Sequence, residues 1–162
     1  MYIGPPIGSA AGYKSNASLS KDAKQASNKA HEASGVASDK DPSSHNLAQE
    51  AHWHAAHVNR ACGNESAAKD HEKCARVHGE KAQRASRAKM FAQDAARDAD
   101  TLSAKAGKSK FGADPDDPRS STELHTDAAT AHTHASKAFD MAGMKRDSAY
   151  HAAKAKSHLQ KA

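Results

Sequence analysis

The chain contains one long stretch twice, first as HNLAQEAHWHAAHVNRACGNESAAKDHEKCARVHGEKA (45–82) and again as HTDAATAHTHASKAFDMAGMKRDSAYHAAKAKSHLQKA (125–162). The two copies align without gaps and are identical at 12 of 38 positions, whereas chance in so alanine-rich a chain gives about three or four. Five of the identities are histidines. These histidines therefore belong to a repeated structural unit.

Each copy predicts two helices joined at a glycine. Gly63 and Gly143 stand where a helix end favours a left-handed residue, and good helix formers follow each of them at once. Alanines and histidines recur at spacings of three and four along each copy, which is typical of a helix with one packed face. Because the connections are so short, we expect antiparallel αα-hairpins.

Proline near a helix start marks the beginning of each hairpin. Asp41-Pro42 precedes the first copy and Asp117-Pro118 precedes the second, and proline is favoured in the first turn. No helix breaker follows until Gly107, so the second helix of the first hairpin is expected to run from about Glu65 to Ala106, about 60 Å. The predicted class is all-α, an elongated helical bundle of two duplicated hairpins plus an N-terminal helix and arm. The expected segments are an extended Gly/Pro arm (1–17), an N-terminal helix (18–35), the first hairpin unit (42–106), a linker (107–119) and the second hairpin unit (120–162).

The chain is poor in large apolar residues. Leu, Ile, Val and Phe number 13 of 162, far below the roughly 20% where chains begin to look unable to fold. Alanine, which supplies most of the apolar content, buries little area, so we expect a marginal monomer that is stabilised by partners. The helix at 18–35 is the expected neighbour for the apolar side chains in the second half of this long helix, which are Met90, Phe91, Ala95 and Leu102.

The N-terminal arm looks suited to docking rather than to folding alone. MYIGPPIGSAAGYKS (1–15) combines glycines and prolines with four tyrosine or isoleucine side chains. We expect these to be held by a partner protein. The docking residues are Tyr2, Ile3, Ile7 and Tyr13.

The histidines admit three interpretations. Folding each hairpin at its glycine places His52 level with His78 and His132 level with His158, which favours packed, hydrogen-bonding histidines in the seam between the two helices. Imidazole titrates near pH 6.5, so buried histidines could also act as a proton sensor. The predicted seam residues are His52, His71, His78, His132, His151 and His158.

A metal site is the third interpretation. His71, Cys74 and His78 share a helix face, and His52 could complete a tetrahedral set. The repeat argues against it, because Lys154 replaces Cys74 in the second copy. We therefore predict no metal, no cofactor and no catalytic residue, and free thiols at Cys62 and Cys74, whose spacing along the hairpin exceeds disulfide reach.

The basic segment KCARVHGEKAQRASRAK (73–89) raises nucleic-acid binding as an alternative function. A basic helix can follow phosphates in a salt-dependent way, but aromatic residues for base stacking are almost absent here. The net charge is only +5, from 24 basic and 19 acidic residues. The candidate contacts for nonspecific nucleic acid are Lys73, Arg76, Lys81, Arg84, Arg87 and Lys89.

The hairpin segments, with the turn Ala61-Cys62-Gly63-Asn64, resemble Ala/His-rich helical hairpins of structural, head-associated proteins of tailed bacteriophages. The resemblance implies a virion component whose arm docks on a capsid or portal neighbour, and it carries over no functional residues. Together with the small core, it predicts a non-enzymatic structural or assembly protein, either a homo-oligomer or part of a larger particle. No apolar run reaches the ~18 residues of a membrane span, so we expect a virion or cytoplasmic location.

Overall fold

The computed structural model describes residues 16–108 and 117–162, and every regular element in these ranges is a helix. The predicted all-α class is therefore confirmed. The proposed docking residues Tyr2, Ile3, Ile7 and Tyr13, and the linker from 109 to 116, lie outside the described residues. The helices are α1 (Asn16–Val36), α2 (Pro42–Ala61), α3 (Glu65–Lys108), α4 (Ser121–Met141) and α5 (Lys145–Leu159).

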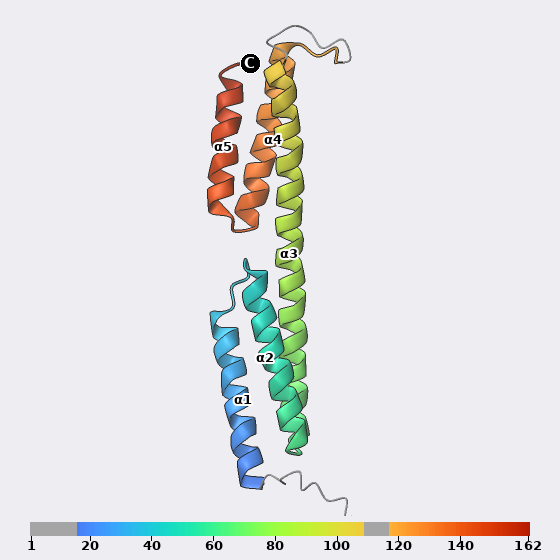
Figure 1. The fold of residues 1–162 in the computed structure, drawn as a ribbon, viewed down its shortest axis with the longest axis vertical. Coiled ribbons are helices and arrows are strands. Elements are labelled where there is room, and N and C mark those ends of the chain that lie inside the picture. The colour runs from blue at the N-terminus through green and yellow to red at the C-terminus, as the bar shows by residue number, and fades with distance from the viewer. Residues whose placement is uncertain (1–15, 109–116) are drawn as a thin grey trace, which may run out of the picture. The chain divides into compact units, whose positions relative to one another are not determined.

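The chain divides into two compact units within α3. Among the described residues, the first unit holds those up to Ala37 together with Asn46–Gly79, and the second holds Ser38–His45 together with those from Glu80 to Ala162. Each unit thus combines a helical hairpin with a third helix, which is α1 in the first and the C-terminal part of α3 in the second (Figure 1). The sequence instead favoured a division at the linker 107–119.

The helix starts follow from local capping. Pro42 is the first residue of α2. The backbone amides of Ser43 and Ser44 donate to the two carboxylate oxygens of Asp41, at 3.1 and 3.2 Å, and so cap the helix. Ser120 and Glu123 form a reciprocal capping box at the start of α4. The first helix begins at Asn16, two residues before its expected start at residue 18.

Two glycines reverse the chain within the hairpins. Gly63 and Gly143 both have φ +78°, the left-handed conformation that the sequence predicted. After α2, the Gly63 amide donates to the Arg60 carbonyl and the Asn64 amide donates to the Asn59 carbonyl, both at 2.9 Å. These two bonds are the Schellman pattern, which satisfies the last carbonyls of the helix.

We expect Gly63→Ala to lower the free energy of unfolding by about 1–2 kcal/mol, because an L-residue in the left-handed region is strained. Open space surrounds an added Cβ at Gly63, so backbone strain rather than a clash causes the loss. Chemical denaturation followed by circular dichroism measures it. Gly35→Ala, at a helical position with equally open space, is the control and should not destabilise the protein; equal losses for both variants would contradict the interpretation.

The interior is built from alanine. Of the 20 buried apolar residues among those described, 18 are alanines, and the two large ones are Leu124 and Phe139. Met90 and Phe91 are more than half exposed. Their expected packing against residues 18–35 is wrong, because this part of α3 is the third helix of the second unit and turns its alanines inward.

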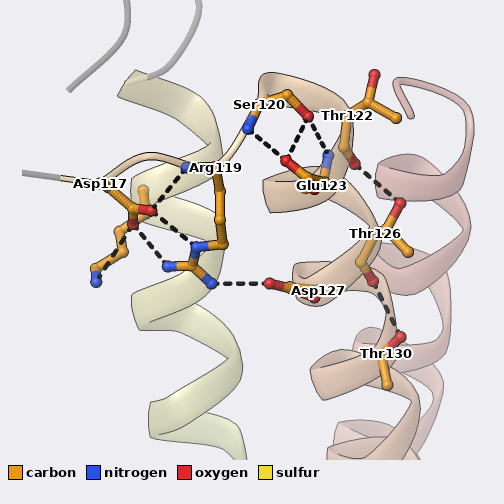
Figure 2. A network of polar contacts seen from close by, with 9 residues as sticks. Asp117, Arg119, Ser120, Thr122, Glu123, Thr126, Asp127 and Thr130 are labelled. Carbon is orange, nitrogen blue, oxygen red and sulfur yellow. Dashed lines mark hydrogen bonds and ion pairs between the residues drawn. The ribbon is translucent and has the colours of Figure 1, made fainter. Parts of the chain in front are cut away.

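An ion-pair network joins the start of α4 to α3 within the second unit. Arg119 makes two parallel hydrogen bonds to the Asp117 carboxylate, at 2.8 and 2.6 Å, and a third to Asp127 at 2.8 Å (Figure 2). Lys105 of α3 lies 3.8 Å from the same Asp117 carboxylate. The Arg119 guanidinium lowers the pKa of Asp117 to about 2, so the network stays ionised at neutral pH.

Arg119→Gln is expected to lower the unfolding midpoint of the second unit, because a neutral amide cannot bridge two carboxylates. Thermal unfolding followed by circular dichroism measures the change. Arg97→Gln is the control, since Arg97 is exposed and makes one 3.5 Å pair with Asp94, three residues away in the same helix. If the two variants melt alike, the network does not hold α4 in place.

Candidate functional site

The polar interior consists almost entirely of histidines. Seven of the eight buried polar residues among those described are histidines, and Asn59 is the eighth. Buried imidazoles need hydrogen-bond partners, and no buried side-chain nitrogen or oxygen in the described part lacks one. The histidines are therefore the polar framework of each unit.

The first histidine cluster comprises His31, His52, His71 and His78 with Ser27 and Ser34, all in the first unit. The Ser34 hydroxyl bonds Nε2 of His52 at 2.7 Å and Nε2 of His78 at 2.9 Å. Nδ1 of His52 meets Nδ1 of His71 at 2.9 Å, and Nε2 of His71 bonds the Ser27 hydroxyl at 2.9 Å. One continuous chain of hydrogen bonds thus links three helices.

The second histidine cluster comprises Asp100, Ser103, His125, His132, His151 and His158 in the second unit. The Ser103 hydroxyl bonds Nε2 of His132 at 2.6 Å and Nε2 of His158 at 2.9 Å. Nδ1 of His132 meets Nδ1 of His151 at 2.8 Å, and Nδ1 of His158 meets Nδ1 of His125 at 2.9 Å. Four imidazoles and one hydroxyl therefore form a single chain.

The bridging serine of each cluster comes from the third helix, and neither serine was predicted from the sequence. Ser34 lies in α1 and Ser103 in α3. The number of residues between these two serines is smaller than the number between matching residues of the two hairpins, so the alignment that reveals the hairpins does not pair the serines. A signal was present, because Ala23, Ala26, Ala30 and Ser34 match Ala92, Ala95, Ala99 and Ser103 in type and spacing. Aligning the sequence with itself so that Ser34 meets Ser103 would have revealed the third helix.

One of the differences between the two units is a matched pair of side chains beside the clusters. In the first unit, the Asn59 side-chain amide donates to the Ser27 hydroxyl at 3.1 Å. At the two positions of the second unit that match Asn59 and Ser27 stand Phe139 and Ala96, which pack in one apolar cluster. Phe139 also stacks on the His151 ring, with centroids 5.2 Å apart. A polar pair in one unit is thus replaced by an apolar pair in the other.

If their histidines are neutral, the hydrogen-bond chains require alternating tautomers. A neutral imidazole has one N–H donor and one acceptor nitrogen, whereas an imidazolium has two donors. At each Nδ1–Nδ1 contact one ring must donate and the other accept. The single hydroxyl hydrogen of Ser103 can likewise be donated to only one of its two histidines. Charging both rings of an Nδ1–Nδ1 contact would leave two donors facing each other.

We expect His132 and His158 to be opposite tautomers at pH 7.5, because Ser103 donates to one ring and accepts from the other. His132 and His151 are also expected to be opposite tautomers, because only one of the two Nδ1 atoms in contact can carry the hydrogen. Long-range 1H–15N correlation spectra of the imidazoles measure this. The same tautomer in both members of either pair, or a protonated ring at this pH, would contradict the arrangement.

Burial makes two central histidines poor bases. Burial, with a further contribution from the charge of His71, lowers the pKa of His52 to about 4. Burial, followed by the charge of His151, likewise lowers the pKa of His132 to about 4, although Asp100 acts in the opposite direction. Burial also lowers the pKa of His71 and of His158. These groups stay neutral at physiological pH.

The structure brings the predicted seam histidines together in two sets. His52 and His78 stack at a centroid distance of 5.6 Å, and His132 and His158 do so at the same distance. Of the six, only His78 is half-buried, and the other five are buried. Each pair of stacked rings shares one serine.

The cysteines do not take part in either cluster. Both are free thiols; Cys62 donates to the Leu19 carbonyl at 3.1 Å and Cys74 is exposed. The metal set that combined Cys74 with His52, His71 and His78 is therefore not assembled. Among the described residues, the group with metal-ligand spacing is instead Asp100, His132 and His151.

The candidate nucleic-acid contacts are divided between the units. Lys73 and Arg76 are exposed in the first unit. In the second, Arg84 and Arg87 are exposed, Lys89 is half-buried, and Lys81 pairs with Asp39 at 2.9 Å. The carboxylate at Asp39 thus neutralises one of the six basic groups.

Comparisons with known proteins assign the chain to no family. No protein-family model matches the sequence, and neither curated proteins nor solved structures give a significant match. None of the described helices combines the length and the apolar character that crossing a membrane requires.

Proposed function

We propose that the chain is a structural protein that functions in an assembly with protein partners, including copies of itself. The observation that carries this is the distribution of its apolar side chains. Alanine and neutral histidine fill the interior, while most large apolar residues of the described part lie outside it. The exposed ones are Val36, Leu47, Trp53 and Val77 in the first unit, and Met90, Phe91, Met141, Tyr150 and Leu159 in the second.

The physical argument concerns the area that each unit can bury. Burial stabilises by about 25 cal/mol per Å², and a methyl side chain offers little area. Each exposed Leu, Phe or Met offers about 1.5–3 kcal/mol on full burial. A partner that covers several of them therefore supplies stabilisation that the alanine interior does not.

The test is the molar mass and stability of the purified chain as a function of concentration. We expect the mass in light scattering to rise above the 17.1 kDa monomer, and the unfolding midpoint to rise with concentration. Phe91→Gln should weaken the association, since Phe91 is 65% exposed. Gln93→Ala, an exposed change two residues away in α3, is the control. A stable monomer at all concentrations, with Phe91→Gln unchanged, would overturn the proposal.

A narrower proposal, a head-associated component of a tailed-bacteriophage virion, rests on the resemblance of the hairpin segments. It predicts that a tagged chain, expressed in the cell that encodes it, sediments with phage-sized particles. Recovery in the low-mass fractions alone would contradict it. The alternative, nonspecific nucleic-acid binding, would instead give retardation of duplex DNA that persists near about 150 mM salt.

A further inference from the structure

One group of side chains in the second unit has the geometry of a metal site. Asp100 of α3, His132 of α4 and His151 of α5 each offer a ligand atom, and these atoms lie within 4.8 Å of one another. The two histidines are buried and Asp100 is exposed. Three ligands from three helices thus converge, with the carboxylate on the solvent side.

The ring of His132 is already held as a metal ligand would be. Its Nε2 lies 2.6 Å from the Ser103 hydroxyl, and a ligating histidine usually donates its second ring N–H to such an oxygen. Donation from Nε2 leaves the lone pair on Nδ1, which faces His151. The His151 ring is fixed by stacking on Phe139, at an interplanar angle of 15°.

The equivalent position in the first unit provides an independent observation. His31 stands three residues before the bridging Ser34, as Asp100 stands three residues before the bridging Ser103. The His31 ring centroid lies 6.0 Å from that of His52 and 5.5 Å from that of His71. Both units therefore place an exposed side chain of metal-ligand type beside a buried histidine pair.

We propose that Asp100, His132 and His151 bind a divalent transition-metal ion of the zinc type, with further positions open to water. Two imidazoles and one carboxylate suit such an ion, whereas Mg²⁺ and Ca²⁺ prefer oxygen ligands alone. The two Nδ1 atoms lie 2.8 Å apart, and nitrogens on a tetrahedral zinc are ~3.3 Å apart, so the rings separate by about half an ångström on binding. The metal takes the place of the hydrogen that the two rings share, and that hydrogen moves from Nδ1 to Nε2 of His151, so that both rings bind as neutral imidazoles.

Charge at the site favours a cation. Asp100 supplies one negative charge, and its effect on His132 opposes the lowering of the pKa. Lys154 opposes binding, but its side chain is drawn over the Tyr150 ring, 5.5 Å from the centroid. Its effect is the smallest among the causes that shift the pKa of His132. This site is independent of the assembly function proposed above.

The experiment is calorimetric titration of the full, chelator-treated chain with ZnCl₂ at pH 7.5. We expect one equivalent to bind to the second unit, and Asp100→Ala to weaken this binding at least tenfold. Asp100 is exposed, so the variant should keep the circular dichroism of the parent. Asp98→Ala, an exposed carboxylate two residues away, is the matched control and should bind like the parent.

A histidine-rich chain can also bind zinc adventitiously on its surface. His54 and His57 are exposed and three residues apart on α2, so His54→Ala/His57→Ala tests that source. Binding that survives this double substitution but is weakened by Asp100→Ala supports the site, as do zinc-dependent shifts of the His132 and His151 15N signals. Absence of binding, or binding indifferent to Asp100→Ala, overturns it.

Discussion

Acidification from pH 7 to pH 4.5 is expected to unfold the protein, with most of the loss of stability between pH 6.5 and 4.5. The pKa of His52 and that of His132 are both lowered from 6.5 to about 4 in the folded protein, mainly by burial. Each pKa unit corresponds to about 1.4 kcal/mol, so full protonation costs each unit about 3 kcal/mol. That is a large part of the stability of a small domain.

The direction follows from linkage between protonation and folding. A histidine with a lowered folded pKa takes up its proton more readily in the unfolded chain, so protons favour unfolding. The stabilisation is fully present above pH 6.5 and is lost progressively as the pH falls towards 4. Two contacts amplify the loss, because protonated rings at the Nδ1–Nδ1 contacts of His52–His71 and His132–His151 would direct two N–H groups at each other.

Urea denaturation followed by circular dichroism at pH 7.5, 6.5, 5.5 and 4.5 measures this dependence. His54→Ala/His134→Ala is the matched control, because both residues are exposed neighbours of the buried histidines on the same helices. The double variant should show the pH profile of the parent. A free energy of unfolding that is constant from pH 7.5 to 5 would show that the buried histidines are not neutral hydrogen-bonded groups.

Ser103→Ala is expected to lower the free energy of unfolding of the second unit by about 2–4 kcal/mol at pH 7.5. An unsatisfied buried polar group costs about 1–3 kcal/mol, and this substitution removes one hydrogen-bond partner from each of two imidazole rings. The Ser103 hydroxyl is the shared partner of Nε2 in two buried histidines, His132 and His158. Helix propensity alone would make this substitution stabilising by some tenths of a kcal/mol, because alanine is a better helix former than serine.

Ser86→Ala provides the comparison for Ser103→Ala. Ser86 lies in the same helix and is exposed, so its substitution should be neutral to slightly stabilising. Thermal and urea unfolding of both variants measures the difference. If Ser103→Ala is as stable as Ser86→Ala, the bridge between the two histidines contributes nothing to stability. Ser34→Ala, at the bridging serine of the first unit, should reproduce the loss there.

The helices and their turns were predictable because their signals are local. Pro42 and Asp41 start α2, and the left-handed glycines at 63 and 143 end the first helix of each hairpin, as expected. The capping box of Ser120 and Glu123 starts α4, so Pro118 precedes the helix and does not lie in its first turn as expected. Each signal acts through hydrogen bonds between near neighbours in the sequence. The alignment of His52 with His78 also follows from the hairpin geometry, because a short turn fixes which residues face each other.

The third helix of each unit was not predictable from such signals. Phe91 was expected to pack against the first helix, but residues 80–108 form a unit with α4 and α5. The segment that joins the third helix to its hairpin is shorter in the first unit than in the second, so the third helices and the hairpins recur at different offsets. Ser34 and Ser103 were overlooked for the same reason, although each completes its cluster.

Local sequence was sufficient for the all-α class, for the helix boundaries to within a few residues, and for the periodic faces that carry alanine and histidine. Those properties depend on backbone propensity, capping and the 3.6-residue repeat, which act along a single chain segment. Three features emerged only from packing in three dimensions: which helix joins each hairpin, the bridging of two imidazoles by one serine, and the position of Asp100 beside His132 and His151. These depend on atoms from three helices meeting within a few ångströms, because hydrogen bonding and pKa shifts require contact and burial that no sequence spacing specifies.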